Sequence, residues 1–278
     1  MKVMNTRSKI LKGILYVILV LMALVMLVPF AWMLSASLKL DKDVFIFPIQ
    51  WIPENPRWQN YQDIWTRIPL FQFVLNTVKL TLIVTFLQLL TSSFAAYAFA
   101  KLRFKGRNFL FMAYIATIAV PWQVYMVPQF MMMRSMGLAD THLAIICLQA
   151  FSAFGVFMMK QFYEGIPTEL CEAARIDGMS EYQIWYRVMV PLSKPALSTL
   201  TIFTFVNTWN DYFLQLVMLT SEEKWTLPLA IANMQGEMSS DFGLIMAGAA
   251  LASIPIIVVF IAFQKYFTQG IAMGAVKG

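Results

Sequence analysis

The chain has 278 residues, of which 59% are apolar and 13% are charged. A soluble fold of this length could not hide so much apolar surface from water, so the composition excludes a soluble globular protein and predicts an integral membrane protein. The formal net charge of +6 gives no reason to expect a nucleic-acid partner, because the basic residues are distributed as a membrane topology requires.

Six runs of mainly apolar residues follow one another, at about 13–36, 73–100, 108–131, 142–160, 197–219 and 244–265. Each is long enough to cross a hydrocarbon core of about 30 Å as a helix, which satisfies its own backbone hydrogen bonds. The predicted fold class is an all-α integral membrane protein with six transmembrane helices, and residues 1–278 are interpreted as a single domain. The fifth run is the least regular because polar residues interrupt it.

The orientation follows from the basic residues. With the N-terminus inside, the inner segments hold 14 of the 21 lysines and arginines, and the outer segments hold six. We therefore expect a multi-pass protein of the cell (plasma or inner) membrane with both termini in the cytoplasm. The first apolar run is longer than the roughly 7 to 15 apolar residues of a secretory signal, so we expect an uncleaved anchor.

The segment 165–195 is polar in a chain that is otherwise almost all membrane, and it predicts two short helices on the cytoplasmic side. Gly178 is suited to a left-handed cap that ends the first helix. Ser180 and Gln183 have the spacing of a capping box that starts the second, and Pro191 is expected to end it. Two interpretations remain: a surface gripped by a soluble partner, or an amphipathic hairpin lying on the lipid headgroups.

Amide and carboxylate groups inside the bilayer are costly and usually face a cavity or the bundle interior. The candidates for a translocation path are Gln123, Asn207, Asn210 and Asp211, together with Gln149, although some of these groups can instead bridge helices. Lys79 lies at a similar predicted depth to Asp211. The two are predicted either to form an ion pair or to reach separately toward water.

Catalysis finds little support in this sequence. There is no Gly-x-x-x-x-Gly-Lys-Ser/Thr loop to hold nucleotide phosphates, so the chain is not expected to hydrolyse ATP. One histidine and two separated cysteines make a zinc site or a Cys-His pair improbable. The carboxylates of Glu169 and Glu172 would be the pair to suspect in a membrane enzyme, but their place near solvent suits a docking surface better. We expect no catalytic residue, no bound cofactor and no metal.

The stretch Glu172-Ala-Ala-Arg-Ile-Asp177-Gly178, with Pro191 thirteen residues later, resembles the EAA loop of bacterial ABC importer permeases. Further stretches resemble the carbohydrate-type permeases, specifically the six-helix partner equivalent to the smaller maltose permease subunit. These stretches are Val28-Pro-Phe-Ala-Trp32, Ala95-Ala-Tyr-Ala-Phe-Ala-Lys101, Pro121-Trp-Gln-Val-Tyr-Met-Val-Pro128, Trp209-Asn-Asp-Tyr-Phe213, and a C-terminal tail from Tyr266 to Gly278. The likeness runs nearly end to end.

The resemblance implies a permease subunit of an ATP-driven sugar importer. Its partners would be a second, related permease in a heterodimer, an ATP-binding cassette ATPase dimer that holds ATP and Mg²⁺, an extracellular sugar-binding protein, and membrane lipid. The residues implied to couple the chain to the ATPase are Glu169, Glu172, Ala173, Ala174, Asp177 and Gly178. Two residues depart from the family pattern, Cys171 before Glu172 and Met179 after Gly178.

Two other function classes stay open at this point. An ABC permease for another solute, such as a glycerol phosphate ester, a peptide or phosphate, would share the 165–195 segment and differ in its cavity. A polytopic membrane enzyme or a channel unrelated to ATPases would not need that segment.

Overall fold

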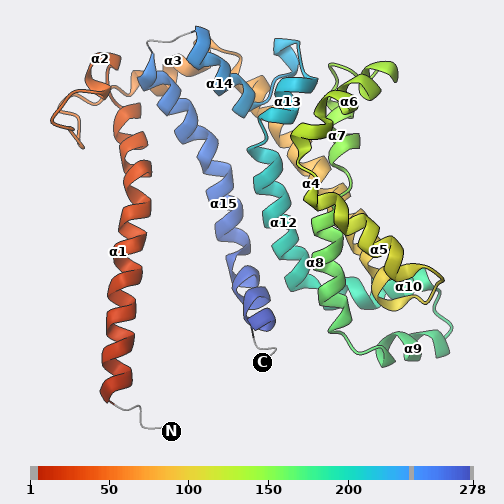
Figure 1. The fold of residues 1–278 in the computed structure, drawn as a ribbon. Helices are drawn as coiled ribbons and strands as arrows, with labels where there is room; N and C mark the ends of the chain where they lie inside the picture. Colours follow the sequence, from red (N-terminus) through yellow and green to blue (C-terminus); the bar gives the residue numbers. More distant parts are fainter. Residues whose placement is uncertain (1–5, 238–240, 276–278) are drawn as a thin grey trace. The chain divides into compact units, whose positions relative to one another are not determined.

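The computed structural model describes residues 6–237 and 241–275, and within them every regular element is a helix. This confirms the all-α prediction (Figure 1). The longer helices are α1 (Thr6–Ser37), α4 (Leu70–Lys101), α5 (Arg107–Ala116), α6 (Trp122–Ser135), α8 (Ala153–Glu164), α12 (Lys194–Trp209), α14 (Leu227–Glu237) and α15 (Phe242–Ala275). The shorter ones are α2 (Asp41–Val44), α3 (Gln59–Arg67), η1 (Thr117–Ala119), α7 (His142–Gln149), α9 (Glu169–Ile176), α10 (Glu181–Ile184), η2 (Trp185–Met189), α11 (Val190–Leu192), α13 (Phe213–Met218) and η3 (Glu222–Lys224).

Four stretches are long and apolar enough to cross a membrane: Leu11–Ser37, Leu70–Lys101, His142–Glu164 and Phe242–Lys265. Two further pairs of helices pass the same test only as bent pairs, which gives up to six spans. One pair, α5 with η1 and then α6, bends by 101° next to Pro121. The other pair joins Glu181–Leu192 to α12 with a bend of 82°.

A proline inside an apolar span is expected to break the helix there, and three prolines of this chain differ from that expectation. Pro121 breaks the third span as its position predicts, but Pro128 lies inside α6 and Pro255 inside α15, and both helices continue through them. Pro191 lies inside α11 and does not end that helix, because the preceding η2 is a π-helix in which the Val190 N–H donates to the Trp185 carbonyl. In a π-helix each N–H donates to the carbonyl five residues earlier instead of four. The pairing of carbonyls therefore shifts at the position where Pro191 has no N–H.

Contacts divide the chain into two compact units, one of residues 1–69 with 231–253, the other of 70–230 with 254–278. In the first unit, Asn60 donates to the carbonyls of Ser37 and Lys39 at 2.9 and 3.0 Å, which holds α3 against the chain that follows α1. A Cβ on Gly243 would lie 2.5 Å from the Lys39 carbonyl oxygen, so α15 begins where only glycine fits. The single domain over 1–278 stays a prediction.

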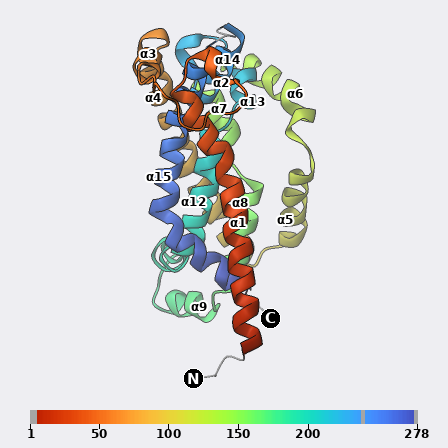
Figure 2. The same ribbon diagram turned by 90° about the vertical axis from the view of Figure 1, so that its left-hand side faces the viewer.

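In the second unit, α4 packs along α8 and α12, and small residues bring these helices together. A Cβ on Gly155 would lie 2.3 Å from the Ser92 hydroxyl oxygen, so α8 and α4 meet where a side chain is missing. Ser152 caps α8 by accepting from the Gly155 N–H at 3.0 Å. Figures 1 and 2 show α9 at one end of this unit and α6 and α13 at the other.

Candidate functional site

The first candidate site is the helix pair of the 165–195 segment. Gly178 has φ +80°, as the sequence predicts, and ends α9 in a left-handed cap. The Met179 N–H donates to the Ala174 carbonyl and the Gly178 N–H to the Arg175 carbonyl, both at 3.0 Å. The capping box of Ser180 and Gln183 is also formed. These local signals fix the angle at which α9 meets α10.

The two faces of α9 differ. Cys171 (0% exposed) and Ala174 (6% exposed) are buried in this chain's own core, with Tyr97, Ile184 and Met189. The outward face carries the exposed residues Glu169, Leu170, Glu172, Ala173, Ile176 and Asp177. Of the two alanines that the resemblance implies couple the chain to the ATPase, only Ala173 is on that face. The structure thus narrows the candidate docking surface by one residue.

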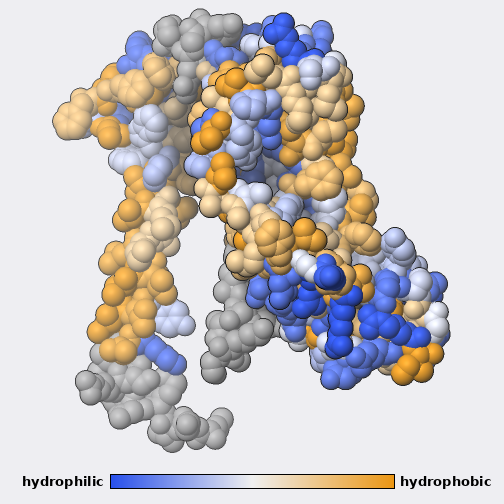
Figure 3. Space-filling model, turned by 45° about the vertical axis from the view of Figure 1, so that its right-hand side comes forward, coloured by the Kyte–Doolittle hydropathy of each residue, from blue (hydrophilic) through white to orange (hydrophobic). Residues whose placement is uncertain are grey.

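Two apolar residues on this face were missed from the sequence. Ile176 is 87% exposed and Leu170 is 43% exposed, each next to acidic neighbours. Figure 3 shows hydrophilic side chains gathered at this end of the second unit. Exposed aliphatic side chains ringed by charge are typical of a protein contact. The amphipathic pattern of α9, taken alone, would have pointed to both.

An ion pair fixes the two helices to each other. Arg175 donates to both carboxylate oxygens of Glu181, at 2.7 and 3.2 Å. This hydrogen bonding holds the pKa of the Glu181 carboxyl below its ordinary value, so the pair stays ionised at neutral pH. Arg175 therefore points into the hairpin and does not belong to the outward face of α9.

The second candidate site is a cavity of about 490 Å³ between α4, α6, α7, α8, α12 and α13. Its wall combines aromatic rings with amides, hydroxyls and one carboxylate. The lining residues are Gln88, Trp122, Tyr125, Gln129, Leu148, Gln149, Ser152, Phe154, Phe203, Thr204, Asn207, Thr208, Asp211, Phe213 and Leu214. Among these described lining residues there is no lysine, arginine or histidine.

The polar groups of the cavity are tied together across helices. Gln149 donates to the Asp211 carboxylate at 2.6 Å, and the Leu214 N–H donates to the same carboxylate at 3.3 Å. Gln88 donates to the Gln149 backbone carbonyl at 2.7 Å and accepts from Thr204 at 3.0 Å. The buried Oε1 of Gln149 has no hydrogen-bond partner among the described residues, so it remains able to accept one.

The predicted path residues separate into two groups. Asn207, Asp211 and Gln149 line the cavity, whereas Gln123 and Asn210 are not among the lining residues. Asn210 donates to the Val206 carbonyl of its own helix at 3.0 Å. The cost of an amide inside an apolar span also applies to Gln88, and this signal would have found it.

The ion pair between Lys79 and Asp211 is not formed. Lys79 Nζ lies 3.1 Å from His142 Nδ1, and the Asp211 carboxylate accepts from Gln149 and Leu214. α12 ends at Trp209, and the break before α13 begins places Asp211 in a turn, where backbone and amide donors satisfy it. A lysine partner is therefore unnecessary.

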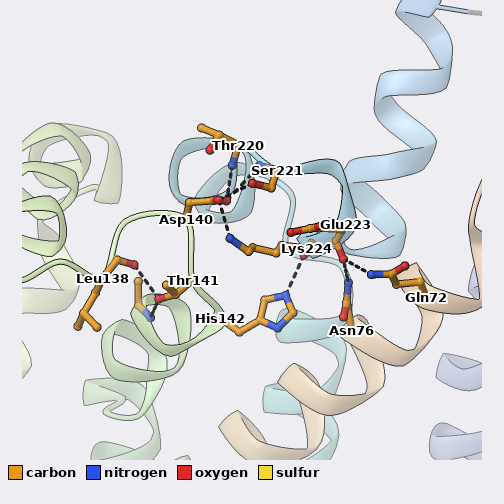
Figure 4. A network of polar contacts seen from close by, with 11 residues as sticks. Gln72, Asn76, Leu138, Asp140, Thr141, His142, Thr220, Ser221, Glu223 and Lys224 are labelled. Atoms are coloured by element: carbon orange, nitrogen blue, oxygen red, sulfur yellow. Dashed lines mark hydrogen bonds and ion pairs between the residues drawn. The ribbon is translucent and has the colours of Figure 1, made fainter.

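At the other end of the second unit, a polar network holds the loop 219–226 (Figure 4). The carboxylate of Asp140 accepts from the N–H groups of Thr220 and Ser221 at 2.9 and 3.0 Å. It also accepts from the Ser221 hydroxyl at 2.5 Å and from Lys224 Nζ at 2.7 Å. Asp140 has φ +57°, a left-handed conformation that aspartate tolerates better than most residues. One side chain thus organises the whole loop.

We expect Asp140→Ala to detach this loop, because it removes four acceptor contacts at once. The expected loss in the free energy of loop opening is roughly 2 to 3 kcal/mol. Hydrogen–deuterium exchange of the Thr220 and Ser221 amides measures it. Asp140→Asn keeps an oxygen for both amides and tolerates the same φ, so it should show the smaller increase in exchange. Equal exchange in Asp140→Ala and the unaltered chain would show that the network does not hold the loop.

The contact between the Asp140 carboxylate and the loop 219–226 is expected to weaken only at acidic pH. Burial acts to raise the pKa of the Asp140 carboxyl, but the hydrogen bonds from Lys224, Ser221 and Thr220 together outweigh it and lower the pKa. A lowered folded pKa means that the stabilisation is fully present above the ordinary carboxyl value of about 4 and is lost only as the pH falls below it. Exchange in the unaltered chain should therefore show no contribution from Asp140 protonation between about pH 5 and 8.

Residues 88–273 match the family described as binding-protein-dependent transport system inner membrane component. The chain belongs to this family. The matched residues include the 165–195 segment and every residue that lines the cavity, from Gln88 to Leu214. The predicted multi-pass membrane protein and the predicted resemblance to importer permeases are confirmed.

Individual relatives agree with the family. The chain is 36% identical over 203 residues to the arabinooligosaccharides transport system permease protein AraQ of Halalkalibacterium halodurans, covering 73% of each chain. It is 32% identical over 262 residues to the lactose transport system permease protein LacG of Rhizobium radiobacter, covering 94% of this chain and 95% of that one. In the crystal structure of a bacterial ABC transporter involved in the import of the acidic polysaccharide alginate, one chain matches with a TM-score of 0.82 and 27% identity. That match covers 96% of this chain and 100% of the other.

Proposed function

We propose that this chain is the permease subunit of an ATP-driven carbohydrate importer, paired with a second permease and coupled to a separate ATPase. The observation that carries the proposal is the arrangement of the 165–195 segment. The outward face of the capped helix α9 presents exposed apolar side chains next to carboxylates, while its other face is buried in the core of this chain. A hairpin lying on headgroups would turn its apolar face to the lipid, whereas the buried face of α9 packs in this chain's own core. In this proposal the segment and both termini are cytoplasmic, and an extracellular binding protein delivers the sugar.

The cavity supports a sugar as the solute. Aromatic rings stack on the C–H faces of sugars, and amides and carboxylates bond their hydroxyls. The lone carboxylate and the lack of a basic side chain among the described lining residues are unfavourable to phosphate or a phosphate ester, since a second negative charge would be repelled. The substrates in the names of these relatives, arabinooligosaccharides and lactose, agree with a sugar.

The direct test is purification of the tagged chain from its native membrane. The expected complex contains an ATP-binding cassette protein and a second permease, and in proteoliposomes with the binding protein it takes up labelled oligosaccharide only when ATP is present. A homodimer of this chain that transports with the ATPase alone would contradict the heterodimer. A chain purified without any ATPase would contradict the function.

The cavity gives a second test, by cysteine labelling. After Cys147 and Cys171 are replaced, we expect Asn207→Cys to react with a polar thiol reagent and to be protected by the transported sugar. Leu82→Cys is the control, because Leu82 is an exposed apolar residue on α4 that does not line the cavity and should face lipid. If Asn207→Cys stays unlabelled in every nucleotide state, the cavity is not the path.

A further inference from the structure

One face of α4 contacts the 165–195 segment at three separate points. Ser93, Tyr97 and Lys101 are spaced four residues apart, so they form a single stripe along the last turns of the helix. All three are buried, with exposures of 2%, 2% and 8%. A buried polar stripe on a membrane helix requires partners, and the segment supplies one to each of the three residues. Ser93 has a second partner outside the segment, the Tyr163 hydroxyl of α8 at 2.7 Å.

One partner lies at the start of the segment and two lie four residues apart in its second helix. Lys101 Nζ donates to the Ile166 carbonyl at 2.5 Å, at the start of the segment. The Tyr97 hydroxyl donates to the Glu181 carboxylate in α10. Trp185 Nε1, in the π-helix η2, donates to the Ser93 hydroxyl oxygen at 2.9 Å. The start of the segment and its second helix are thus both attached to α4.

The attachment extends to the outward helix α9. Glu181, held by Tyr97, is also held by Arg175 of α9 at 2.7 Å, and Cys171 and Ala174 of α9 lie in the core cluster that contains Tyr97. Phe94 stacks on Tyr182 with ring centroids 5.7 Å apart. A displacement of α9 therefore meets hydrogen bonds, an ion pair and packing, all of which lead to α4.

The backbone connection from the 165–195 segment to α12 is interrupted, unlike the contact of the segment with α4. The segment joins α12 through the π-helix η2, α11 and a bend of 82° at Ser193. α4 has no such break, and it continues from Tyr97 to Gln88, which lines the cavity and bonds to Gln149 and Thr204. The straight path from α9 to the cavity wall runs through α4.

We propose that Ser93, Tyr97 and Lys101 are positioning residues that join the 165–195 segment and α4 into one rigid body, so that displacement of α9 moves Gln88 and the cavity wall. This inference rests on the proposed function, since it assigns the path by which the ATPase reaches the cavity. It predicts that α4 follows the segment, while the bend at Ser193 absorbs the difference in motion of α12.

The test uses the complete transporter with its ATPase, second permease and binding protein. The double variant Tyr97→Phe, Lys101→Met removes two attachments and keeps the ring and the aliphatic stem in place. We expect the ATPase to remain bound and active while sugar taken up per ATP hydrolysed falls about tenfold, the effect of losing charged hydrogen bonds at a buried contact. Tyr114→Phe, on α5 away from the segment, is the control and should leave the ratio unchanged.

A covalent link distinguishes positioning from general damage. Phe94→Cys and Tyr182→Cys replace the stacked pair, both of whose members are exposed, and the exposed Cys147 is replaced by serine. Joining the two thiols with a short bifunctional reagent should restore the ratio in the double variant. In the otherwise unaltered chain the same link should leave uptake intact, because the two elements already move together.

Either of two results would overturn the inference: an unchanged ratio in the double variant, or a loss of uptake when the link is formed in the otherwise unaltered chain. The second result would mean that the segment must slide along α4. A failure of the proposed function has a different signature, because it appears already in the unaltered chain as a missing ATPase.

Discussion

Gly178→Val is expected to abolish ATP-driven uptake while leaving the chain inserted in the membrane. Gly178 has φ +80°, and an added Cβ would meet nothing within 4 Å, so the effect comes from the backbone and not from a clash. A β-branched residue in this conformation costs about 1 to 3 kcal/mol, which the capping hydrogen bonds cannot repay unless the turn changes. A changed turn tilts α9 away from α10 and misplaces its outward face. The measurements are membrane insertion, ATPase co-purification and uptake, with an expected loss of at least about tenfold in uptake.

A second glycine with a left-handed backbone provides a matched control for the backbone strain of a β-branched substitution. Gly137 has φ +72° at the end of α6, again with nothing within 4 Å of an added Cβ, but it lies at the opposite end of the unit from α9. Gly137→Val should lower stability by a similar amount and leave the ATPase bound. Gly178→Asn, which tolerates the left-handed region, should keep most of the uptake. Normal insertion and an unaltered transport rate in Gly178→Val would mean that the segment is an ordinary surface loop.

Neighbouring alanines on α9 should give opposite phenotypes. Ala174 is 6% exposed and packs with Ile184 and Met189, so Ala174→Leu overpacks the chain's own core at a cost of about 1 to 3 kcal/mol. Ala173 is exposed on the outward face, so Ala173→Leu should leave the fold unchanged and block the ATPase. Thermal unfolding of the isolated chain in detergent measures the first effect, and ATPase co-purification measures the second.

A conservative substitution at the exposed position 173 serves as the reference. Ala173→Ser changes little in volume and should behave as the unaltered chain in both measurements. If Ala173→Leu lowers the unfolding temperature of the isolated chain as much as Ala174→Leu does, the assignment of the two faces is wrong. If it leaves ATPase binding unchanged, the docking face lies elsewhere.

Features set by local chemistry were predictable. The left-handed Gly178 and the capping box of Ser180 depend only on residues a few positions away, and both form as expected. The cost of polar groups inside the bilayer drew attention to Asn207 and Asp211, which line the cavity, and also to Gln123 and Asn210, which do not. In each case the free energy at stake is local, so neighbouring sequence is sufficient to indicate the outcome.

Features set by packing were not predictable. Whether Ala173 or Ala174 faces inward depends on which face of α9 meets α4, and the adjacent alanines are equally small. The continuation of α6 through Pro128 depends on how the freed carbonyl is satisfied, which the sequence does not specify. The partner of Asp211 is Gln149, 62 residues away along the chain, and the approach of α7 to α13 that brings them near is a tertiary contact.

Helix α4 is fixed at both ends. Asn76 and Gln72 donate to the carbonyl of Glu223 in the loop 219–226, and the stripe from Ser93 to Lys101 holds the 165–195 segment. Its 32 residues span roughly 48 Å, the full depth of a bilayer with its headgroups. In the proposed importer we expect a helix bonded at both membrane surfaces to couple the docking of the ATPase to the docking of the binding protein, and any such coupling is reciprocal. If ATP binding inside alters the affinity of a protein outside by some factor, the arrival of that protein must alter the affinity for ATP by the same factor. In the proposed importer, arrival of the sugar-loaded binding protein would then change the affinity for ATP before ATP is hydrolysed.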